Sequence, residues 1–498
     1  MSSILLESEN EKYLIQGLLV KNKFKIRVKS KQGWGYFADY DNYFVLDTNR
    51  NIRSTLPITE EIAPKLIQNI LKQGETEGFY LVDEQHYASS TGESQEIVHF
   101  HSDYEKNYTS TGSKLLAHFP IFEKLRDTGY GSIVRATLTL HQLCSSHCQF
   151  CSTIARSRKD SISLQEAKDF ISTLFFDQAE YNRKHFPEYN EKYKQLTGSD
   201  IRLRGLILSG GGQPNLWPHF EELVNWIKAE TDIELGLITN GFPKKINEDI
   251  YTKFEWIRLS ITPEDASPFY PDAKFNKQYI PETVLNGPST FGLSYVYGPW
   301  TNNDILKRIS AAKAAWSADY VRILTDCNLT RELQLEAHRS LANKLIELEI
   351  IDSDGKDKNG IFHQLKYHSK KEDAEKIWDA GQCFLQSYNV FWDTTGHEEN
   401  GKSYCYACDS ITVLSEMSSD STVNVSERKF DGSIWGTVTN DEVKRLYSEK
   451  LQAFFDPRKV CTACLFFKNN EKVKQLLASD FDVKSLKDAQ GITHKNFP

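Results

Sequence analysis

The chain has 498 residues and a formal net charge of −8 at pH 7, with 39% hydrophobic and 26% charged residues. This composition is ordinary for a soluble globular protein, and the length predicts two or three domains. The acidic balance argues against a general nucleic-acid or membrane-surface binder. No apolar run reaches the roughly 18 residues of a membrane span, and the N-terminal sequence has no signal-peptide pattern, so we expect a cytoplasmic protein without a membrane partner.

The first part of the chain predicts a small β+α module, residues 1–83. Strand-like alternation covers residues 20–46, and a helix with Thr59 as its N-cap follows. Residues 84–130 are polar and rich in turn formers, which predicts a linker.

Residues 131–350 alternate strand patterns with helix patterns, which predicts an α/β domain with a parallel sheet. The predicted strands are residues 133–140, 205–211, 234–241, 255–261, 291–298 and 320–326. The predicted helices are residues 163–176, 219–230, 303–316 and 330–348, with residues 177–204 as a polar insertion. In such folds the reactive groups gather at the carboxyl ends of the strands.

Nine cysteines in a reducing compartment favour metal ligation over disulfides, because most of them are clustered. Seven of them form one group of three and two C-x2-C pairs: Cys144, Cys148, Cys151; Cys405, Cys408; Cys461, Cys464. The group of three has the spacing C-x3-C-x2-C directly after the first predicted strand. Three thiolates can ligate three irons of a 4Fe-4S cluster and leave the fourth iron open. The alternative is a zinc site, although zinc loops favour paired knuckles with four closed ligands.

A glycine-rich segment, Ser209 to Pro214, ends the second predicted strand. Glycines at a strand end allow a ligand to approach the backbone closely. Gln213 follows Gly211 and Gly212, and its amide oxygen can accept a hydrogen bond from an ammonium group.

Together these motifs, with the aromatic Phe150 before the third cysteine, resemble the radical S-adenosylmethionine superfamily. The resemblance implies a partial (β/α)6 barrel in which the open iron binds S-adenosylmethionine through its amino and carboxylate groups. One electron then cleaves this cofactor to a 5′-deoxyadenosyl radical, which abstracts a hydrogen atom from the substrate. The resemblance also implies a reductase partner such as flavodoxin or ferredoxin.

The same resemblance assigns cofactor-binding positions. They are Phe150, Gly211, Gly212, Gln213, Ser260 and Arg322. Gln213 stands where the family's Gly-Gly-Glu-Pro motif has glutamate. Ser260 is expected to bind the ribose, or else merely caps a strand end. Arg322 is expected to pair with the methionine carboxylate, with Arg156 and Arg158 as alternatives.

The residues Thr239-Asn240-Gly241 resemble a frequent turn of the same superfamily. A tight turn with glycine at positive φ is the simpler explanation of this motif.

The two C-x2-C pairs lie in residues 381–475, which follow a connection at 351–380 and precede a tail at 476–498. Their arrangement resembles the twitch or SPASM domain, which implies one auxiliary 4Fe-4S cluster. A four-thiolate structural zinc site is the alternative.

Cys383 and Cys327 lie outside these groups, and each is either a small buried hydrophobe or a hydrogen-atom donor, with Cys383 preferred as the donor and Cys327 as the alternative. The overall layout resembles peptide epimerases of the proteusin type among the radical maturases of ribosomal peptides. The resemblance implies a precursor peptide, leader plus core, whose Cα hydrogen is abstracted and then replaced from a thiol, converting an L-residue to a D-residue. In such enzymes a module like residues 1–83 grips the leader, although a structural extension is an equal alternative.

Other functions remain open from the sequence. They are thioether or carbon–carbon cross-linking of a peptide, action on a non-peptide substrate, and a leader-peptide-binding protein with a degenerate active site.

Overall fold

The structure is a computed structural model. It describes residues 3–7, 12–20, 23–29, 43–46, 52–54, 108, 112–146, 148, 150–151, 157–261, 279–326, 331–351, 359–364, 383–394, 403–408, 440–451, 466–477 and 492–498. The chain divides into two compact units, Met1–Phe100 and His101–Pro498.

The first unit contains a five-stranded antiparallel sheet whose strands follow chain order. The strands are β1 (Ser3–Glu7), β2 (Lys12–Val20), β3 (Lys23–Lys29), β4 (Tyr43–Leu46) and β5 (Ile52–Ser54). Strands β3 and β4 fall within the region predicted to alternate. The helix predicted after Thr59 lies outside the described residues.

The second unit is built on a nine-stranded sheet with the order β12-β11-β10-β9-β8-β7-β6-β13-β14. Its strands are β6 (Arg135–Thr139), β7 (Gly205–Ser209), β8 (Glu234–Thr239), β9 (Trp256–Ile261), β10 (Thr290–Tyr297), β11 (Tyr320–Thr325), β12 (Ile361–Gln364), β13 (Asn389–Asp393) and β14 (Tyr404–Tyr406). Strands β6 to β12 are parallel and sequential, and β13 joins β6 in parallel. The predicted α/β fold class with a parallel sheet is confirmed, as is each of the six predicted strands.

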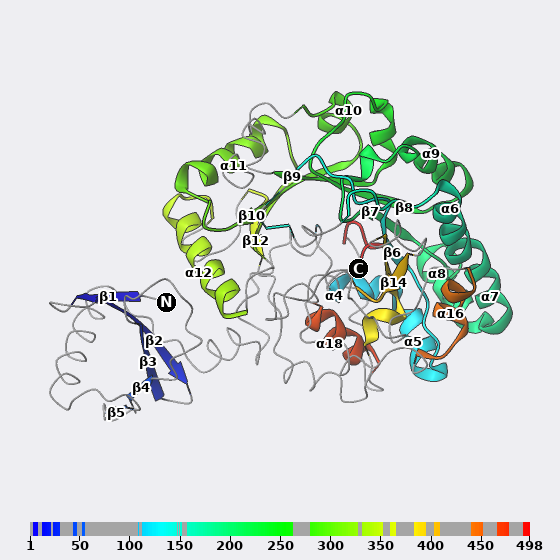
Figure 1. The fold of residues 1–498 in the computed structure, drawn as a ribbon. Coiled ribbons are helices and arrows are strands. Elements are labelled where there is room, and N and C mark those ends of the chain that lie inside the picture. The colour runs from blue at the N-terminus through cyan, green and yellow to red at the C-terminus, as the bar shows by residue number, and fades with distance from the viewer. Residues whose placement is uncertain are drawn as a thin grey trace. The chain divides into compact units, whose positions relative to one another are not determined.

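Helices connect these strands and lie on the outer side of the arc that the strands form (Figure 1). The connecting helices are α6 (Leu164–Ser172), α7 (Gln178–His185), α8 (Pro187–Thr197), α9 (Phe220–Glu230), α10 (Glu282–Leu285), α11 (Asn303–Ala315) and α12 (Arg331–Glu347). Helix α6 begins at a capping box in which Ser163 and Glu166 bond each other's backbone N–H groups. Helices α7 and α8 form the predicted insertion.

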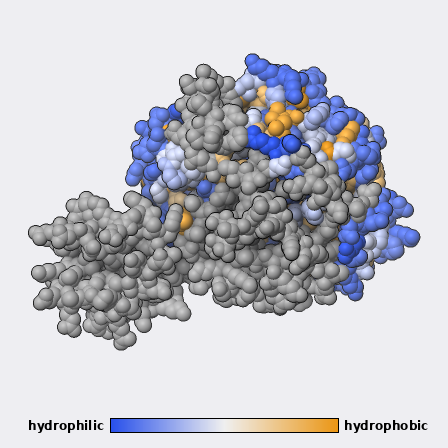
Figure 2. Space-filling model, in the orientation of Figure 1, coloured by the Kyte–Doolittle hydropathy of each residue, from blue (hydrophilic) through white to orange (hydrophobic). Residues whose placement is uncertain are grey.

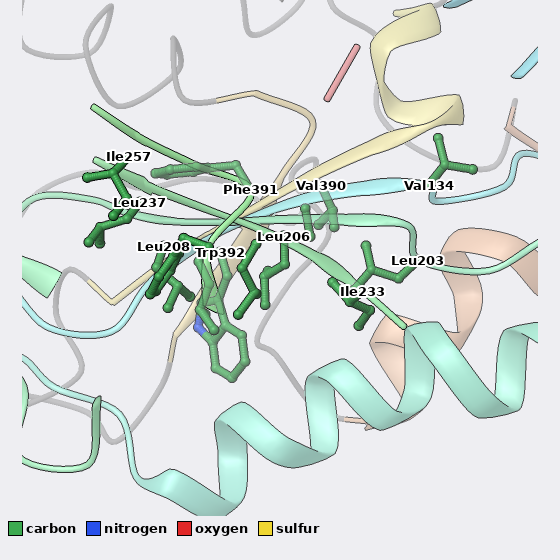
Figure 3. Packing of buried hydrophobic residues seen from close by; sticks show 14 of the residues in the cluster. Val134, Leu203, Leu206, Leu208, Ile233, Leu237, Ile257, Val390, Phe391 and Trp392 are labelled. Carbon is green, nitrogen blue, oxygen red and sulfur yellow. The ribbon is translucent and has the colours of Figure 1, made fainter. Parts of the chain in front are cut away.

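The main core lies between the sheet and these helices. Strand side chains alternate, so every second residue faces the helices, as for Leu206 and Leu208 of β7 (Figure 3). Trp392 of β13 packs against Phe170 of α6, with ring centroids 4.6 Å apart. Each such fully buried side chain stabilises the fold by about 1.5–3 kcal/mol. On the face shown in Figure 2 the described surface is mostly hydrophilic, and none of the described helices combines the length and apolar character needed to span a membrane.

Part of the predicted linker 84–130 is helical and buried. Helix α4 (Gly112–Leu115) and helix α5 (Phe119–Thr128) lie within it, and Phe122 is fully buried. Pro120 lies in the first turn of α5, and Gly129 ends the helix in the left-handed conformation. The linker was predicted from the polar sequence that precedes residue 115. The apolar residues between 115 and 125 recur at helical spacing and form the buried face of these helices.

Residues 492–498 close the inner side of the sheet at the amino ends of its strands. His494 Nε2 lies 2.9 Å from Thr290 Oγ1, and Asn496 Nδ2 donates to Glu234 Oε1 at 2.7 Å. Phe497 packs edge-on against Trp256, with ring centroids 5.4 Å apart. The tail therefore forms a floor beneath the strands.

Replacing Phe497 by alanine is expected to lower the free energy of unfolding by about 3–5 kcal/mol, the usual range for a buried phenylalanine. The side chain is 3% exposed and lies among Trp256 and Ile207, so its removal leaves a cavity. Thermal unfolding measures the change. The exposed Phe176→Ala is the matched control, and an equal effect of both variants would contradict a packed floor.

Candidate active site

The cysteine loop begins at the carboxyl end of β6, as predicted. Its base is closed by backbone hydrogen bonds from Gln142 N–H to Asp160 O at 2.9 Å and from Ile162 N–H to Leu140 O at 3.1 Å. The loop between these residues is therefore anchored at both ends on the strand that carries it.

Cys144, Cys148 and Cys151 are all partly exposed, and none of them is in a disulfide. Cys144 Sγ accepts hydrogen bonds from Ser146 N–H at 3.4 Å and from Asn240 Nδ2 at 3.5 Å. Amide donors directed at a sulfur stabilise the thiolate that ligates a metal. In the described part of the chain no three His, Cys, Asp or Glu side chains converge on one metal-ion position. The chemistry of the donor set, three accessible thiols in one short loop, fits an open 4Fe-4S cluster.

The glycine-rich segment after β7 lies directly against this loop. Gln213 N–H donates to Leu143 O at 2.7 Å, just before Cys144. A Cβ atom at Gly211 would overlap the side-chain amide of Gln142, and one at Gly212 would overlap the backbone of Leu143. Glycine is therefore required at both positions by close approach to the cysteine loop.

Gln213 is buried and joins three segments. Its Oε1 accepts from Ser145 Oγ at 2.7 Å, and its Nε2 donates to Gly241 O at 3.0 Å. Its backbone carbonyl accepts from His141 Nε2 at 2.7 Å. Burial lowers the pKa of His141, which favours the neutral ring. Gln213 Oε1 has a second lone pair, so it can still accept from an ammonium group.

The turn at residues 239–241, which ends β8, contacts the cysteine loop through its central side chain. Asn240 Nδ2 donates to Ser146 Oγ at 2.8 Å, in addition to Cys144 Sγ. The sequence motif predicted the turn, but it did not predict the contact between Asn240 and the cysteine loop.

A polar row crosses strands β9, β10 and β11, at the middle of β10 and β11 and near the carboxyl end of β9. Ser260 of β9 is opposite Ser294 of β10, which is opposite Arg322 of β11. Arg322 is 9% exposed, and its Nη2 donates to Ser294 Oγ at 3.2 Å. Its Nη1 lies 3.4 Å from Gln364 Oε1. The structure thus brings the two predicted residues Ser260 and Arg322 into one row and adds Ser294, which the sequence analysis missed.

The far end of the cysteine loop reaches the connection after β10. The Phe150 ring packs against Trp300, with centroids 5.4 Å apart. Arg158 Nη2 lies 3.5 Å from Ser146 O, and Arg156 lies outside the described residues. The Phe150 side chain therefore packs against the connection that follows the carboxyl end of β10.

A second group of thiols lies beside β13. Cys405 of β14 is opposite Trp392 of β13 and is buried, and Cys408 follows it. Asn389 Nδ2 fixes this turn by donating to Ala407 O at 2.7 Å. Burial raises the pKa of Cys405. Cys461 and Cys464 lie outside the described residues.

Cys383 lies at the amino end of β13, next to the 3-10 helix η7 (Phe384–Ser387). Its Sγ is 3.9 Å from Asn470 Oδ1 on α18 (Phe467–Leu476), and burial raises its pKa. Strand β13 is parallel to β6, with Asn389 opposite Arg135, so Cys383 and the cysteine loop lie at opposite ends of these strands.

Cys327 lies outside the described residues. The residue before it, Asp326, follows the carboxyl end of β11, the same end of the sheet as the cysteine loop.

No protein-family model and no curated protein matches this chain. A solved structure of Streptococcus suis SuiB bound to precursor peptide SuiA is similar over 93% of this chain and 94% of that chain, with 14% identity and a TM-score of 0.41. SuiB bound to S-adenosylmethionine is similar over 90% of each chain, with 12% identity and a TM-score of 0.39. Native anSMEcpe with bound AdoMet and a Cp18Cys peptide covers 73% of this chain and 95% of its own, with 12% identity and a TM-score of 0.36. At these low scores the similarities carry no assignment for this chain.

Proposed function

We propose that this chain is a radical S-adenosylmethionine enzyme that modifies a ribosomal peptide. The observation that carries the proposal is the contact between the C-x3-C-x2-C loop and the glycine-rich segment, in which Gln213 N–H bonds Leu143 O beside Cys144. Cys148 and Cys151 complete the cluster ligands. When bound, the 4Fe-4S cluster supplies one electron that cleaves S-adenosylmethionine to methionine and a 5′-deoxyadenosyl radical.

In this proposal the chain's own residues orient the cofactor. Gly211 and Gly212 allow the glycine-rich segment to pack closely against the cysteine loop, and this packing positions Gln213 to accept from the amino group. Arg322 pairs with the carboxylate, because Ser294 holds its guanidinium in the row of residues that also contains Ser260. Ser260, one strand away in the same row, bonds the ribose.

The proposed reaction is epimerisation of a peptide residue. With the cofactor bound, the Cα hydrogen would pass to the 5′-deoxyadenosyl group, which would give 5′-deoxyadenosine and a carbon radical. A thiol S–H then returns a hydrogen atom to the opposite face, and one electron and one proton restore the thiol. A reductase such as flavodoxin or ferredoxin supplies that electron.

The placement of Asp326 supports Cys327 as the donor thiol. Cys383 is less suited to this role, because it is buried at the other end of β13 from the cysteine loop. We therefore place Cys327 ahead of Cys383, which was preferred from the sequence.

The remaining cysteine pairs are proposed to hold one auxiliary 4Fe-4S cluster: Cys405, Cys408, Cys461, Cys464. Helix α18 begins three residues after Cys464 and lies beside η7, the helix that precedes β13. This neighbourhood supports the proposal that Cys461 and Cys464 lie near Cys405 of β14. Iron and zinc analysis separates this proposal from a structural zinc site.

The first unit is proposed to bind the leader part of the peptide. Its antiparallel sheet ends in strands β1 and β5, and a sheet edge can accept an extended peptide. Removing residues 1–83 should then abolish peptide binding while cofactor cleavage without peptide continues. Unchanged peptide affinity would assign these residues a structural role instead.

The function is tested with anaerobically reconstituted protein, dithionite and a precursor peptide in deuterium oxide. Peptide-stimulated 5′-deoxyadenosine release with a +1 mass shift per modified residue would support epimerisation. A −2 shift would mean cross-linking, and no release with a fully assembled cluster would contradict the radical assignment.

Replacing Cys327 by alanine is expected to leave the first cofactor cleavage intact and to reduce deuterium incorporation to background, because the carbon radical has lost its hydrogen source. Cys383→Ala is the matched control and should keep incorporation if the protein folds. The reverse pattern would return the donor role to Cys383.

A further inference from the structure

The side-chain amide of Asn240 bridges the turn after β8 to the cysteine loop. Its Nδ2 lies 2.8 Å from Ser146 Oγ, 3.3 Å from Ser145 Oγ and 3.5 Å from Cys144 Sγ. These three acceptors all come from one loop, which follows a different strand. The contact is therefore a specific tertiary one and more than a turn preference.

The turn that presents Asn240 is itself held in place. The Thr239 hydroxyl lies 2.8 Å from Gly241 O and 3.1 Å from Asn215 Oδ1. Gly241 O also accepts from Asn215 Nδ2 at 2.9 Å and from Gln213 Nε2 at 3.0 Å. Because the backbone is fixed on both sides of Asn240, its amide is preorganised toward the loop.

Hydrogen bonds to a ligating sulfur withdraw electron density from the metal centre. In iron–sulfur proteins such bonds are among the factors that set the reduction potential. Ser146 N–H already donates to Cys144 Sγ at 3.4 Å, so Asn240 is a second donor to the same sulfur. A second donor stabilises the reduced, more negative cluster.

We infer that Asn240 is a positioning residue that raises the reduction potential of the catalytic cluster through Cys144. The inference rests on the proposed function, because Cys144 must be a cluster ligand. It assigns a role to the motif at residues 239–241 that a simple turn would not have.

The test is a redox titration of the reconstituted cluster, followed by electron paramagnetic resonance without S-adenosylmethionine. Asn240→Ala should shift the potential to a more negative value, with a roughly tenfold loss of reduced cluster at a fixed potential, or about 59 mV for one electron. Asn240→Asp keeps the shape but cannot donate from its carboxylate, so it should shift the potential in the same direction.

Ser146→Ala is the matched control. It removes the shortest bond that Asn240 makes, at 2.8 Å, and leaves the bond to Cys144 Sγ. Its potential should equal that of the wild type. A shift equal to that of Asn240→Ala would mean that loop attachment matters and the sulfur bond does not, which overturns the inference.

The outcomes separate the two proposals. If the wild type assembles no redox-active cluster, the proposed function fails. If it assembles one and both Asn240 variants keep the wild-type potential, the function stands and the inference fails. Asn240→Asp gives the answer if the alanine variant does not fold.

Discussion

Replacing Cys148 by alanine is expected to remove the catalytic cluster and to abolish 5′-deoxyadenosine release. Three thiolates are the minimum that holds a cluster with one open iron. The cysteine loop contains three cysteines, so each of them is needed. The loss should exceed about 100-fold, since even outer-shell partners of a metal site contribute about 10–100-fold. Iron analysis and a cofactor cleavage assay measure both effects.

The matched control is Cys408→Ala, in the second group of thiols. It should leave cofactor cleavage without peptide in place, because the catalytic loop is untouched. Under the two-cluster proposal each variant lowers iron from about eight to about four atoms per chain. Cleavage by Cys148→Ala at the wild-type rate would refute the assignment of the cysteine loop.

The parallel sheet could be predicted from the sequence because each strand from β6 to β11 is a short apolar run between helix patterns. Strands β13 and β14 were missed because they depend on distant partners. Asn389 of β13 pairs with Arg135 at the start of β6, and nothing in the local sequence indicates such a neighbour. The buried helices before β6 were missed for a related reason, since polar residues surround the apolar ones.

The contact between the cysteine loop and the glycine-rich segment could be predicted from motif spacing, whereas the side-chain contacts between strands could not. Spacing placed Cys144 and Gly211 at neighbouring strand ends, and the structure brings these segments into contact. The roles of Asn240 and Ser294 depend on contacts between strands, which sequence spacing does not reveal. The sequence shows that Cys383 lies outside the cysteine groups. That it lies at the opposite end of the strands from the cysteine loop follows only from the register of β13.

Gln142 shows how closely the parts are joined. Its side chain fills the space over Gly211, and its Nε2 donates to Asp393 Oδ1 at 3.1 Å and to Thr394 Oγ1 at 3.2 Å. Asp393 ends β13, the strand that pairs with the strand of Cys405. One side chain thus connects the cysteine loop, the glycine-rich segment and the strand beside the second group of thiols.

Acid is expected to destabilise the fold through His118, which links the buried helical segment to the tail. The ring is fully buried, with Nε2 3.0 Å from Lys495 O and Nδ1 2.7 Å from Tyr193 Oη. Because a carbonyl oxygen only accepts, Nε2 carries the proton and Nδ1 accepts from the tyrosine hydroxyl. Protonating Nδ1 would break this arrangement.

Burial is the main cause that lowers the pKa of His118 to about 4 from 6.5. The unfolded chain therefore binds the proton first, so stability is complete above pH 6.5 and is lost as the pH falls toward 4. At pH 5 the loss from this histidine is about 2 kcal/mol. His118→Gln, which can donate to Lys495 O and accept from Tyr193, should have a smaller loss of stability between pH 7.5 and pH 5. The control is His219→Gln, whose side chain is 50% exposed. Anaerobic thermal unfolding with cluster absorbance followed in parallel measures the difference, and an unchanged pH dependence in His118→Gln would show that this ring is not the acid-sensitive group.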